Sequence, residues 1–312
     1  MRSITEIDFV IVVFNSLEYL DSLLMSIGEN CSNFDYQIII VNNGINDLEF
    51  DFQKYAMNIN ILNPSENLGF GRANNLATKN GNSEILCFLN PDILIKEDIF
   101  TPIIDTIIRN QNVGACAPCL CFENGDVQYS YGFSMGFIYE VLEAFGLIKI
   151  WRKIYELKVN RYNCDKSSKV SVGWVSGACF MVRRSVFESV GGFSKEFFLN
   201  YEDIDLCYKL EMAGYKNFLF PAQVCIHYDH SSFANDYAKL VFTRYESRLI
   251  FSKLNYGLFM RIIIRCLHIL GIMLRLLIII FSKDSSEKEG RFKGYMKSLY
   301  LYIGLPLKCS LK

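Results

Sequence analysis

This chain of 312 residues has little proline, histidine or tryptophan, and neither positive nor negative charges are in clear excess. It has six prolines, three histidines and two tryptophans, and its formal net charge is −1. A charge this close to zero excludes bulk electrostatic binding of nucleic acid, so we expect no nucleic-acid partner. Because 51% of the residues are hydrophobic and only 21% are charged, the chain can bury a core and is not mainly disordered.

A recognisable secretion signal is also missing at the start of the sequence. Residues 1–8 are mixed and charged, and the apolar run Phe9–Phe14 is too short for a signal core. Eleven cysteines could form a disulfide scaffold, but an odd number in so long a chain is not typical of one. We therefore expect free thiols in the reducing cytoplasm.

Two common nucleotide-binding motifs are absent. The sequence has no P-loop, and no G-x-G-x-x-G follows the first apolar run. Gly69-Phe70-Gly71 lacks the third glycine and comes much later. A nicotinamide dehydrogenase and a P-loop kinase are therefore disfavoured. A nucleotidyltransferase would need a basic glycine-rich loop after the first strand, which Phe14-Asn15-Ser16 does not supply.

Apolar runs typical of buried strands alternate with segments of helical periodicity. The expected strands are Phe9–Phe14, Tyr36–Val41, Ile59–Leu62, Ile85–Leu89 and Phe218–Ile226. Leucines at helical spacing predict a helix over 17–27, and a second helix is expected over 72–79. This alternation predicts a doubly wound α/β domain, in which ligands bind at the carboxyl ends of the strands. Three polar turns follow such ends, at Asn15, Asn42–Gly44 and Asn90–Asp92.

The densest chemical signal is a group of three carboxylates, Glu202, Asp203 and Asp205, between bulky apolar residues. Clustered carboxylates repel one another and burial raises their pKa, so a metal, a basic partner or a role as general base is indicated. At helical pitch Glu202 and Asp205 share a face and Asp203 points elsewhere, which allows two roles. His227 follows a strand further on and, with Asp92, could ligate a divalent ion. The alternative is a solvated acidic start of a helix.

The residues resemble glycosyltransferase family 2, especially its rhamnosyltransferase-like branch, over about residues 7–235. The matching stretches are Val10–Asn15, Asn67–Ala77, Phe88–Asp92, Gly173–Arg184, Val190–Phe193 and Phe197–Leu206, with His227 at the expected distance. The resemblance implies a GT-A fold, with a mixed sheet flanked by helices. It also implies transfer of a sugar from a nucleotide-diphosphate donor with inversion of the anomeric centre.

The resemblance assigns roles to single residues. Asp203 corresponds to the catalytic base, with Glu202 beside it, and Asp92 to the ligand of Mg²⁺ or Mn²⁺, with His227 as a second ligand in some members. The nucleotide sugar is expected to meet the residues Asn15, Asn42, Gly69, Arg72, Asn90 and Asp92. Asn42 replaces the Asp that commonly reads the pyrimidine, which leaves the nucleotide open. Asn90 replaces the first Asp of the D-x-D pattern, as is usual in this branch.

Trp174 and Gly177 correspond to the acceptor side of the family's site. An indole can stack on a sugar face. A core aromatic residue packed beside small residues explains Trp174 equally well, and both interpretations stay open.

The last part of the chain is basic and apolar. Residues 255–312 hold ten Lys or Arg and three Asp or Glu, a balance of +7, so residues 1–254 have a balance of −8. Within the apolar run Leu258–Phe281, the side chains Arg261, Arg265, His268 and Arg275 fall on one side of a helix. This predicts a cationic amphipathic helix on an anionic membrane surface. A helix packed on the catalytic body with its arginines outward is the alternative.

We therefore expect a catalytic domain over residues 1–235 and a helical, membrane-associated tail over 236–312. The predicted enzyme is a metal-dependent inverting glycosyltransferase, peripheral or monotopic at the cytoplasmic face of the membrane. Its donor is first expected to be dTDP-rhamnose, and its acceptor a lipid-linked saccharide of a cell-surface polysaccharide such as O-antigen or capsule. Another nucleotide-hexose donor and a non-catalytic, membrane-tethered sugar-binding module are the alternatives.

Overall fold

The computed structural model describes residues 6–14, 17–44, 48–160, 168–229, 236–281 and 287–304. The chain divides into two compact units. The first unit comprises Met1–Ser134, Tyr155–Phe198 and Glu202–Asp229, and the second comprises Met135–Ile154, Leu199–Tyr201 and His230–Lys312. The second unit joins residues 135–154 and 199–201 to the last part of the chain, a grouping that nothing in the sequence pattern indicated. The expected domains over residues 1–235 and 236–312 stay a prediction.

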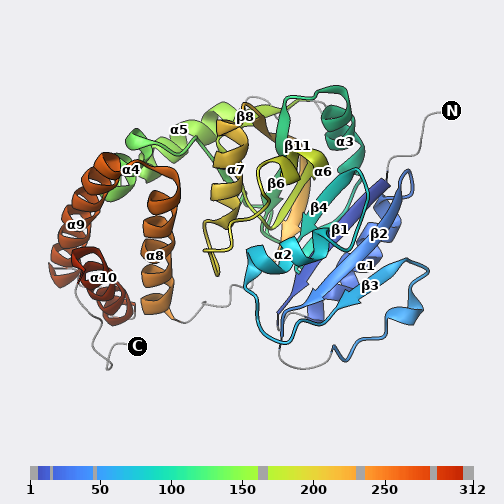
Figure 1. Ribbon diagram of the computed structural model, residues 1–312, viewed down its shortest axis with the longest axis horizontal. Coiled ribbons are helices and arrows are strands. Elements are labelled where there is room, and N and C mark those ends of the chain that lie inside the picture. Colours follow the sequence, from blue (N-terminus) through green and yellow to red (C-terminus); the bar gives the residue numbers. More distant parts are fainter. Residues whose placement is uncertain are drawn as a thin grey trace. The chain divides into compact units, whose positions relative to one another are not determined.

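A nine-stranded sheet forms the first unit in the described part of the chain (Figure 1). Its strands are β1 (Glu6–Val13), β2 (Asp35–Asn42), β3 (Ile59–Leu62), β4 (Ile85–Leu89), β5 (Ile93–Ile95), β6 (Val113–Cys121), β8 (Val170–Val172), β10 (Cys179–Arg183) and β11 (Lys216–His227). Their order is β3-β2-β1-β4-β10-β6-β11-β5, and β8 pairs with β11. A separate small pair joins β7 (Tyr131–Gly132) to β9 (Trp174–Val175).

The sheet is mixed, as expected. Strands β1 to β4 run parallel, with Phe9 opposite both Ile38 and Cys87. Strand β10 is antiparallel to β4 and to β6, while β6 and β11 are parallel. Because β1, β2 and β4 are neighbours with one direction, the turns that follow them lie at the same edge of the sheet.

Helices cover both faces of this sheet. They are α1 (Leu17–Asn30), α2 (Phe70–Thr78), α3 (Phe100–Arg109), α6 (Arg184–Ser189) and α7 (Glu202–Met212), and a short 3₁₀ turn, η1, spans Phe52–Lys54. The start of α3 is fixed by Asp98, whose side chain accepts hydrogen bonds from the amides of Phe100 and Thr101, 2.9 and 3.0 Å long.

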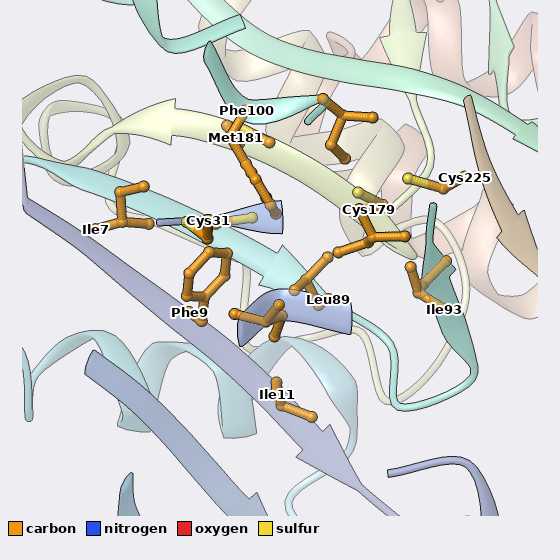
Figure 2. Close-up of a cluster of buried hydrophobic side chains, with 14 of the residues drawn as sticks. Ile7, Phe9, Ile11, Cys31, Leu89, Ile93, Phe100, Cys179, Met181 and Cys225 are labelled. Carbon is orange, nitrogen blue, oxygen red and sulfur yellow. The ribbon is translucent and has the colours of Figure 1, made fainter. Parts of the chain in front are cut away.

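Alternation along the strands builds the two cores. Phe9 and Ile11 of β1 lie with Leu89, Cys179 and other side chains in the cluster under α1 and α3 (Figure 2). Their neighbours in sequence belong to the cluster under α2, α6 and α7 on the other face. A strand buried on both faces needs a continuous apolar run, which is why these strands were recognisable in the sequence.

The second unit is helical. Its helices are α4 (Phe137–Ala144), the first part of α5 (Ile148–Asn160), α8 (Tyr237–Asn255), α9 (Leu258–Phe281) and α10 (Lys288–Ile303). Helix α8 begins at Asp236, whose side chain accepts from the amide of Lys239 at 2.9 Å. A small core of Tyr245, Ile272, Leu276 and Tyr302 joins α8, α9 and α10.

Helix α9 corrects the prediction of an outward cationic face. His268 is buried and pairs with Glu140 of α4, at 2.8 Å between Nε2 and Oε2. Arg275 donates to the carbonyl oxygens of Glu143 and Ala144, and Arg265 donates to the carbonyl of Tyr302. Arg275 thereby caps the carboxyl end of α4, whereas Arg265 remains exposed and Arg261 half-buried, so only part of the predicted cationic face is turned inward.

The outer surface of α9 is apolar instead. Its exposed large side chains are Leu258, Phe259, Ile262, Leu270, Met273, Leu274, Leu277, Ile278, Ile280 and Phe281. Phe259 and Phe281 are 77% and 80% exposed. Among the described helices, α9 is the one long and apolar enough to cross a membrane, judged by length and composition.

Candidate active site

Asn43 ties the carboxyl end of β2 to the glycine loop. Its amide donates to the carbonyl of Val13 at the end of β1, at 2.8 Å. Its side-chain nitrogen donates to Oδ1 of Asn67 at 3.0 Å, and its side-chain oxygen accepts from the amide of Leu68 at 2.8 Å. The end of β1 and the turn after β2 therefore converge with the loop over 67–71.

Gly69 allows this loop to lie against the chain before α7. Its φ is 73°, and a Cβ atom here would lie 2.4 Å from the carbonyl oxygen of Phe198. That same carbonyl accepts from the amide of Phe70 at 3.1 Å. Two residues further on, a Cβ atom on Gly71 would lie 3.5 Å from the Cβ of Glu202. The start of α2 and the start of α7 are thus neighbours.

The turn after β4 joins the same place through the loop over 176–178. The amide of Asn90 donates to the carbonyl of Ala178 at 2.8 Å. The preceding residue, Gly177, donates its amide to Oδ2 of Asp203 at 2.9 Å. The predicted metal-binding turn and the predicted base therefore contact adjacent residues, Ala178 and Gly177, of the same loop.

Asp203 and Glu202 have different surroundings although they are adjacent. Asp203 is half-buried, and its Oδ1 accepts from the amide of Ile204 at 2.8 Å. Burial raises the pKa of Asp203, and the amide hydrogen bonds from Gly177 and Ile204 oppose the rise. Glu202 is buried, and its Oε2 has no hydrogen-bond partner among the described residues. Burial and the nearby charge of Asp203 raise the pKa of Glu202 to about 8.

These environments separate the two carboxyl groups at neutral pH. Glu202 holds a proton, while the amide donors favour the charged form of Asp203. Protonation of Glu202 avoids the repulsion between two adjacent negative charges. Asp203 is therefore the group of this pair that can accept a proton from a substrate.

Asp205, the third carboxylate, has a structural role. It is fully buried and accepts from the hydroxyl of Ser194 at 2.5 Å, and Nζ of Lys209 lies 3.6 Å from its Oδ2. Lys209 also donates to the carbonyl of Gly192 at 2.5 Å. These contacts pin α7 to the loop before it, so the cluster is not a solvated helix start.

His227 points its Nε2 at Asp92. The distance from Nε2 to Oδ1 of Asp92 is 3.4 Å, and the amide of Tyr228 donates to the carbonyl of Asp92 at 3.1 Å. Gln128 orients the ring: its side-chain nitrogen donates to the carbonyl of His227 at 2.5 Å, and its Oε1 lies 2.7 Å from Nδ1. Because that oxygen can only accept, Nδ1 carries a proton, and in the neutral ring the lone pair of Nε2 faces Asp92.

A divalent ion fits this pair. An imidazole lone pair and a carboxylate oxygen cannot hydrogen-bond to one another, but both are metal ligands, and the second ring nitrogen is fixed as metal-bound histidines require. The described residues contain no group of three or more His, Cys, Asp or Glu placed to hold a metal. With one carboxylate and one imidazole, the remaining positions of a bound ion would be filled by water and by phosphate oxygens.

The other predicted donor residues are placed as follows. Asn42, at the end of β2, donates to Oδ1 of Asn63 at 3.0 Å and accepts from the amide of Gly44 at 3.3 Å. Arg72, half-buried on α2, donates its Nε to the carbonyl of Leu68 at 2.7 Å. Asn15 lies outside the described residues. The roles of these residues toward a nucleotide sugar stay predictions.

The side chain of Trp174 is packed in the core and is not exposed to a ligand. It is 6% exposed, and its ring meets that of Tyr129 edge to face at 5.2 Å. A Cβ atom on Gly132 would lie 2.4 Å from its Nε1, so the indole fills the space that this glycine leaves. In this conformation the core interpretation is favoured, and stacking on an acceptor sugar stays a prediction.

Two residues of the site escaped the sequence analysis, Asn43 and Gln128. Asn43 stands in a polar turn that was noted, but nothing local distinguishes it from Asn42. Gln128 is 99 residues from His227, and no short motif contains both. The one usable signal was the expectation that a metal-binding histidine has a second partner.

Comparison with known proteins identifies the class and the family. The model of the family described as "Glycosyl transferase family 2" matches residues 8–191, more than half of the chain, and that described as "Glycosyl transferase family group 2" matches residues 150–276. The protein is a glycosyltransferase. It belongs to glycosyl transferase family 2.

Two of the relatives are named as rhamnosyltransferases. The N-acetylglucosaminyl-diphospho-decaprenol L-rhamnosyltransferase of Mycobacterium tuberculosis is 28% identical over 231 residues, which cover 69% of this chain and 73% of that protein. Rhamnosyltransferase WbbL of Escherichia coli is 27% identical over 233 residues, 71% of this chain and 83% of that protein. The rhamnosyltransferase-like resemblance is confirmed.

Solved structures confirm the GT-A-like fold. The mannosyltransferase PcManGT of Pyrobaculum calidifontis, determined with GDP-Man and Mn²⁺, superposes with a TM-score of 0.56 at 13% identity. The match covers 97% of this chain and 86% of that chain. At this identity the likeness establishes the fold alone.

Proposed function

We propose that the protein is an inverting glycosyltransferase that moves a sugar, first of all rhamnose from dTDP-rhamnose, to a lipid-linked saccharide. The observation that carries the chemistry is the carboxyl group of Asp203, held by the amides of Gly177 and Ile204 and joined through the loop over 176–178 to the Asn90–Asp92 turn. The choice of sugar and acceptor is supported by the names of the two rhamnosyltransferase relatives, one of which acts on a diphospho-decaprenol lipid. The product would extend a cell-surface polysaccharide such as O-antigen or capsule.

Asp203 is the proposed base. Each of its oxygens accepts one amide hydrogen bond, and each keeps a second lone pair that can take a proton. The acceptor hydroxyl gives its proton to Asp203 while its oxygen attacks the anomeric carbon. The bond from that carbon to the diphosphate breaks on the opposite face, so the configuration is inverted. Burial raises the pKa of Asp203 and makes the carboxylate a better base than an exposed one.

Glu202 supports the base by staying neutral. With a pKa of about 8 it is mostly protonated at neutral pH, so it adds no full negative charge beside Asp203. A second charge beside Asp203 would raise the proton affinity of the base further and would repel a diphosphate.

Asp92 and His227 are the proposed holders of Mg²⁺ or Mn²⁺. When bound, the metal would neutralise the charge that develops on the leaving diphosphate. Gln128 keeps the Nε2 lone pair of His227 directed toward Asp92. Arg72, with its Nε on the carbonyl of Leu68, is the proposed cation for the diphosphate. Asn42 and Asn15 are proposed to face the nucleotide.

The apolar surface of α9 supports a peripheral or monotopic position at the cytoplasmic face of the membrane. Ten large apolar side chains of this helix are exposed, while its His268 and Arg275 are used inside the unit. A pocket of about 380 Å³ beside this surface is lined by Leu249, Ile250, Ser252, Lys253, Leu258, Arg261, Ile262 and Arg265. Three cations and no carboxylate around apolar walls suit the phosphate of an anionic lipid.

A thermal-shift panel of nucleotide sugars, each with Mn²⁺, Mg²⁺ or chelator, tests the donor. A ligand that binds the folded state raises the melting temperature, so dTDP-rhamnose with metal should give the largest shift. The selected donor is then assayed for transfer to a polyprenyl-diphosphate saccharide and for the anomeric configuration of the product. A shift with another donor would correct the sugar. A shift without transfer or hydrolysis would favour the non-catalytic sugar-binding module.

A further inference from the structure

The backbone is unusual immediately before the catalytic helix. Asn200 and Tyr201 lead into α7, and their φ angles are 69° and 72°. Residues other than glycine rarely adopt this left-handed conformation, and here two do so in succession. Such strain persists where the surrounding structure over-determines the conformation, and it is concentrated at functional sites.

Helix α8 supplies what holds this turn, and the contacts lie within the second unit. The hydroxyl of Ser247 donates to the carbonyl of Leu199 at 3.2 Å. Arg248 donates from Nε to the hydroxyl of Tyr201 at 2.9 Å and donates a second time from Nη2. The ring of Phe251 meets that of Tyr201 edge to face at 6.1 Å. The side chain of Tyr201 is thereby fixed at both its ring and its hydroxyl.

Arg248 is itself buried, at 2% exposure, among charged groups. Its Nε lies 3.6 Å from Oε2 of Glu140, and its Nη1 lies 3.5 Å from Oε1 of Glu143. Oε2 of Glu140 also pairs with His268. The two direct hydrogen bonds of Arg248 go to the neutral hydroxyl of Tyr201, and the carboxylates lie further away. A purely structural ion cluster would be expected to direct its arginine at the carboxylates.

We propose that Arg248 is a positioning residue for the transfer reaction. Through the hydroxyl of Tyr201 it holds the left-handed turn that directs the chain into Glu202 and Asp203, and thereby sets the orientation of Asp203. The inference rests on the proposed role of Asp203 as the base. Burying a charged group costs folding free energy. In return, the buried Arg248 fixes the conformation of the turn at Tyr201. Displacing a base by about 1 Å can cost about a hundredfold in rate.

The substitution Tyr201→Phe tests the link, because it keeps the ring and removes only the hydroxyl. The matched control is Tyr302→Phe, which removes another buried tyrosine hydroxyl of this unit, one that donates to the carbonyl of Tyr245 at 3.1 Å. We expect both variants to melt at similarly lowered temperatures. Tyr201→Phe should lower kcat about tenfold or more with the donor KM within about twofold. Tyr302→Phe should leave kcat within about twofold.

A double-mutant cycle extends the test to the arginine. If Arg248→Gln acts through Tyr201, the double variant should lose no more kcat than the more damaged single variant. Equal kcat in Tyr201→Phe and Tyr302→Phe, or fully additive losses, would overturn the proposal. Asp203→Asn is assayed in parallel. If it is inactive while Tyr201→Phe is normal, positioning fails and the base stands. If Asp203→Asn is active, the base assignment and the positioning proposal both fail.

Discussion

The amide of Gly177 donates a 2.9 Å hydrogen bond to Oδ2 of Asp203. A Cβ atom on Gly177 would lie 3.4 Å from the Cβ of Asp203 and 3.1 Å from Cε1 of Phe70. The small residue therefore lets the backbone approach the carboxylate closely. This single bond joins the loop that holds Asn90 to the helix that carries the proposed base, so the site depends on main-chain geometry as much as on its carboxylates.

Asp203→Asn should abolish sugar transfer while donor binding survives. Asparagine keeps the shape of the side chain and one acceptor oxygen for the amides of Gly177 and Ile204, but it cannot take a proton from the acceptor hydroxyl. General base catalysis contributes about 10²–10⁴ in rate, and we expect kcat to fall by about that factor. The measurement is transfer under saturating donor, with donor affinity from titration. Near-normal turnover would show that another group is the base.

The pH dependence of stability should report Glu202. Its pKa is raised to about 8 in the folded protein, above the 4.5 of an unperturbed glutamate. The folded state therefore binds this proton more tightly, and the resulting stabilisation is fully present below pH about 4.5 and is lost as pH rises through 8. Glu202→Gln mimics the protonated form. The free energy of unfolding of the wild type should fall relative to the variant by about 1.4 kcal/mol per pH unit across this window.

Denaturant titrations of both proteins between pH 5 and 9 measure this difference. Parallel pH curves for the wild type and Glu202→Gln would mean that Glu202 ionises normally, and that Asp203 works beside a second charge.

Gln128 should tune the metal site without touching the metal. Gln128→Met would leave Nδ1 of His227 without its partner, and the ring would lose its fixed orientation toward Asp92. Loss of such a supporting hydrogen bond typically lowers metal affinity about 10–100-fold. We expect the Mn²⁺ concentration for half-maximal transfer to rise by this factor, while Asp92→Ala should abolish metal-dependent donor binding.

The control for this experiment is Gln37→Met. Gln37 donates to Oδ1 of Asp8 at 2.7 Å, near the amino ends of β1 and β2, away from the edge that carries the site. Its Mn²⁺ dependence should match the wild type. An equal change in the two glutamine variants, or none in Gln128→Met, would contradict the assigned role.

Local pattern made most of the sheet predictable. Strands Ile59–Leu62 and Ile85–Leu89 were predicted with their observed bounds. Ile85–Leu89 is buried on both faces, which demands continuous apolar residues, whereas the edge strand Ile59–Leu62 is half-buried and tolerates Asn60. The contacts of Asn43 and Gln128 were not predictable, because each joins segments that are distant in sequence. The additional members of the second unit, residues 135–154 and 199–201, depend on tertiary packing that no periodicity records.

Helix α9 shows a different limit. The sequence groups its cations on one side of the helix, but it does not show that His268 and Arg275 find partners inside the unit while Arg265 stays exposed. Polar side chains face outward when water is their best partner. Here Arg275 reaches the carbonyls of Glu143 and Ala144, and His268 reaches Glu140, so the buried partners reverse the rule. An amphipathic pattern alone cannot tell which face is outside.

Gly69→Ala should destabilise the loop over 67–71 by more than an alanine in a left-handed conformation ordinarily does. Gly69 and Gly125 have φ angles of 73° and 87°, so an alanine at either position pays about 1–2 kcal/mol. Only at Gly69 would the Cβ atom also meet backbone, 2.4 Å from the carbonyl oxygen of Phe198, whereas at Gly125 nothing lies within 4 Å. Gly69→Ala should therefore lose more stability than Gly125→Ala, and donor affinity as well. Equal losses of stability and unchanged donor affinity would contradict this.

Membrane binding should depend on the apolar outer surface of α9. Deleting residues 255–312 is a poor test, because it would remove Ile272 and its partners from the core of the second unit. The triple variant Phe259→Ser, Ile278→Ser and Phe281→Ser changes only exposed side chains, so folding should be preserved. Each exposed aromatic or aliphatic side chain contributes about 1.5–3 kcal/mol when it is fully buried in lipid. We expect the variant to move from the membrane fraction to the soluble fraction.

The matched control removes three exposed apolar side chains of the first unit, with Met25→Ser, Ile108→Ser and Met212→Ser. It lowers surface hydrophobicity by a similar amount but leaves α9 intact, so it should co-sediment with vesicles like the wild type. Vesicles with and without anionic lipid then separate the two contributions, because the cations Lys253, Arg261 and Arg265 should add affinity only where anionic headgroups are present, and less of it at high salt. Equal release of both triple variants, or sedimentation of the α9 variant at the wild-type level, would show that another surface holds the protein at the membrane.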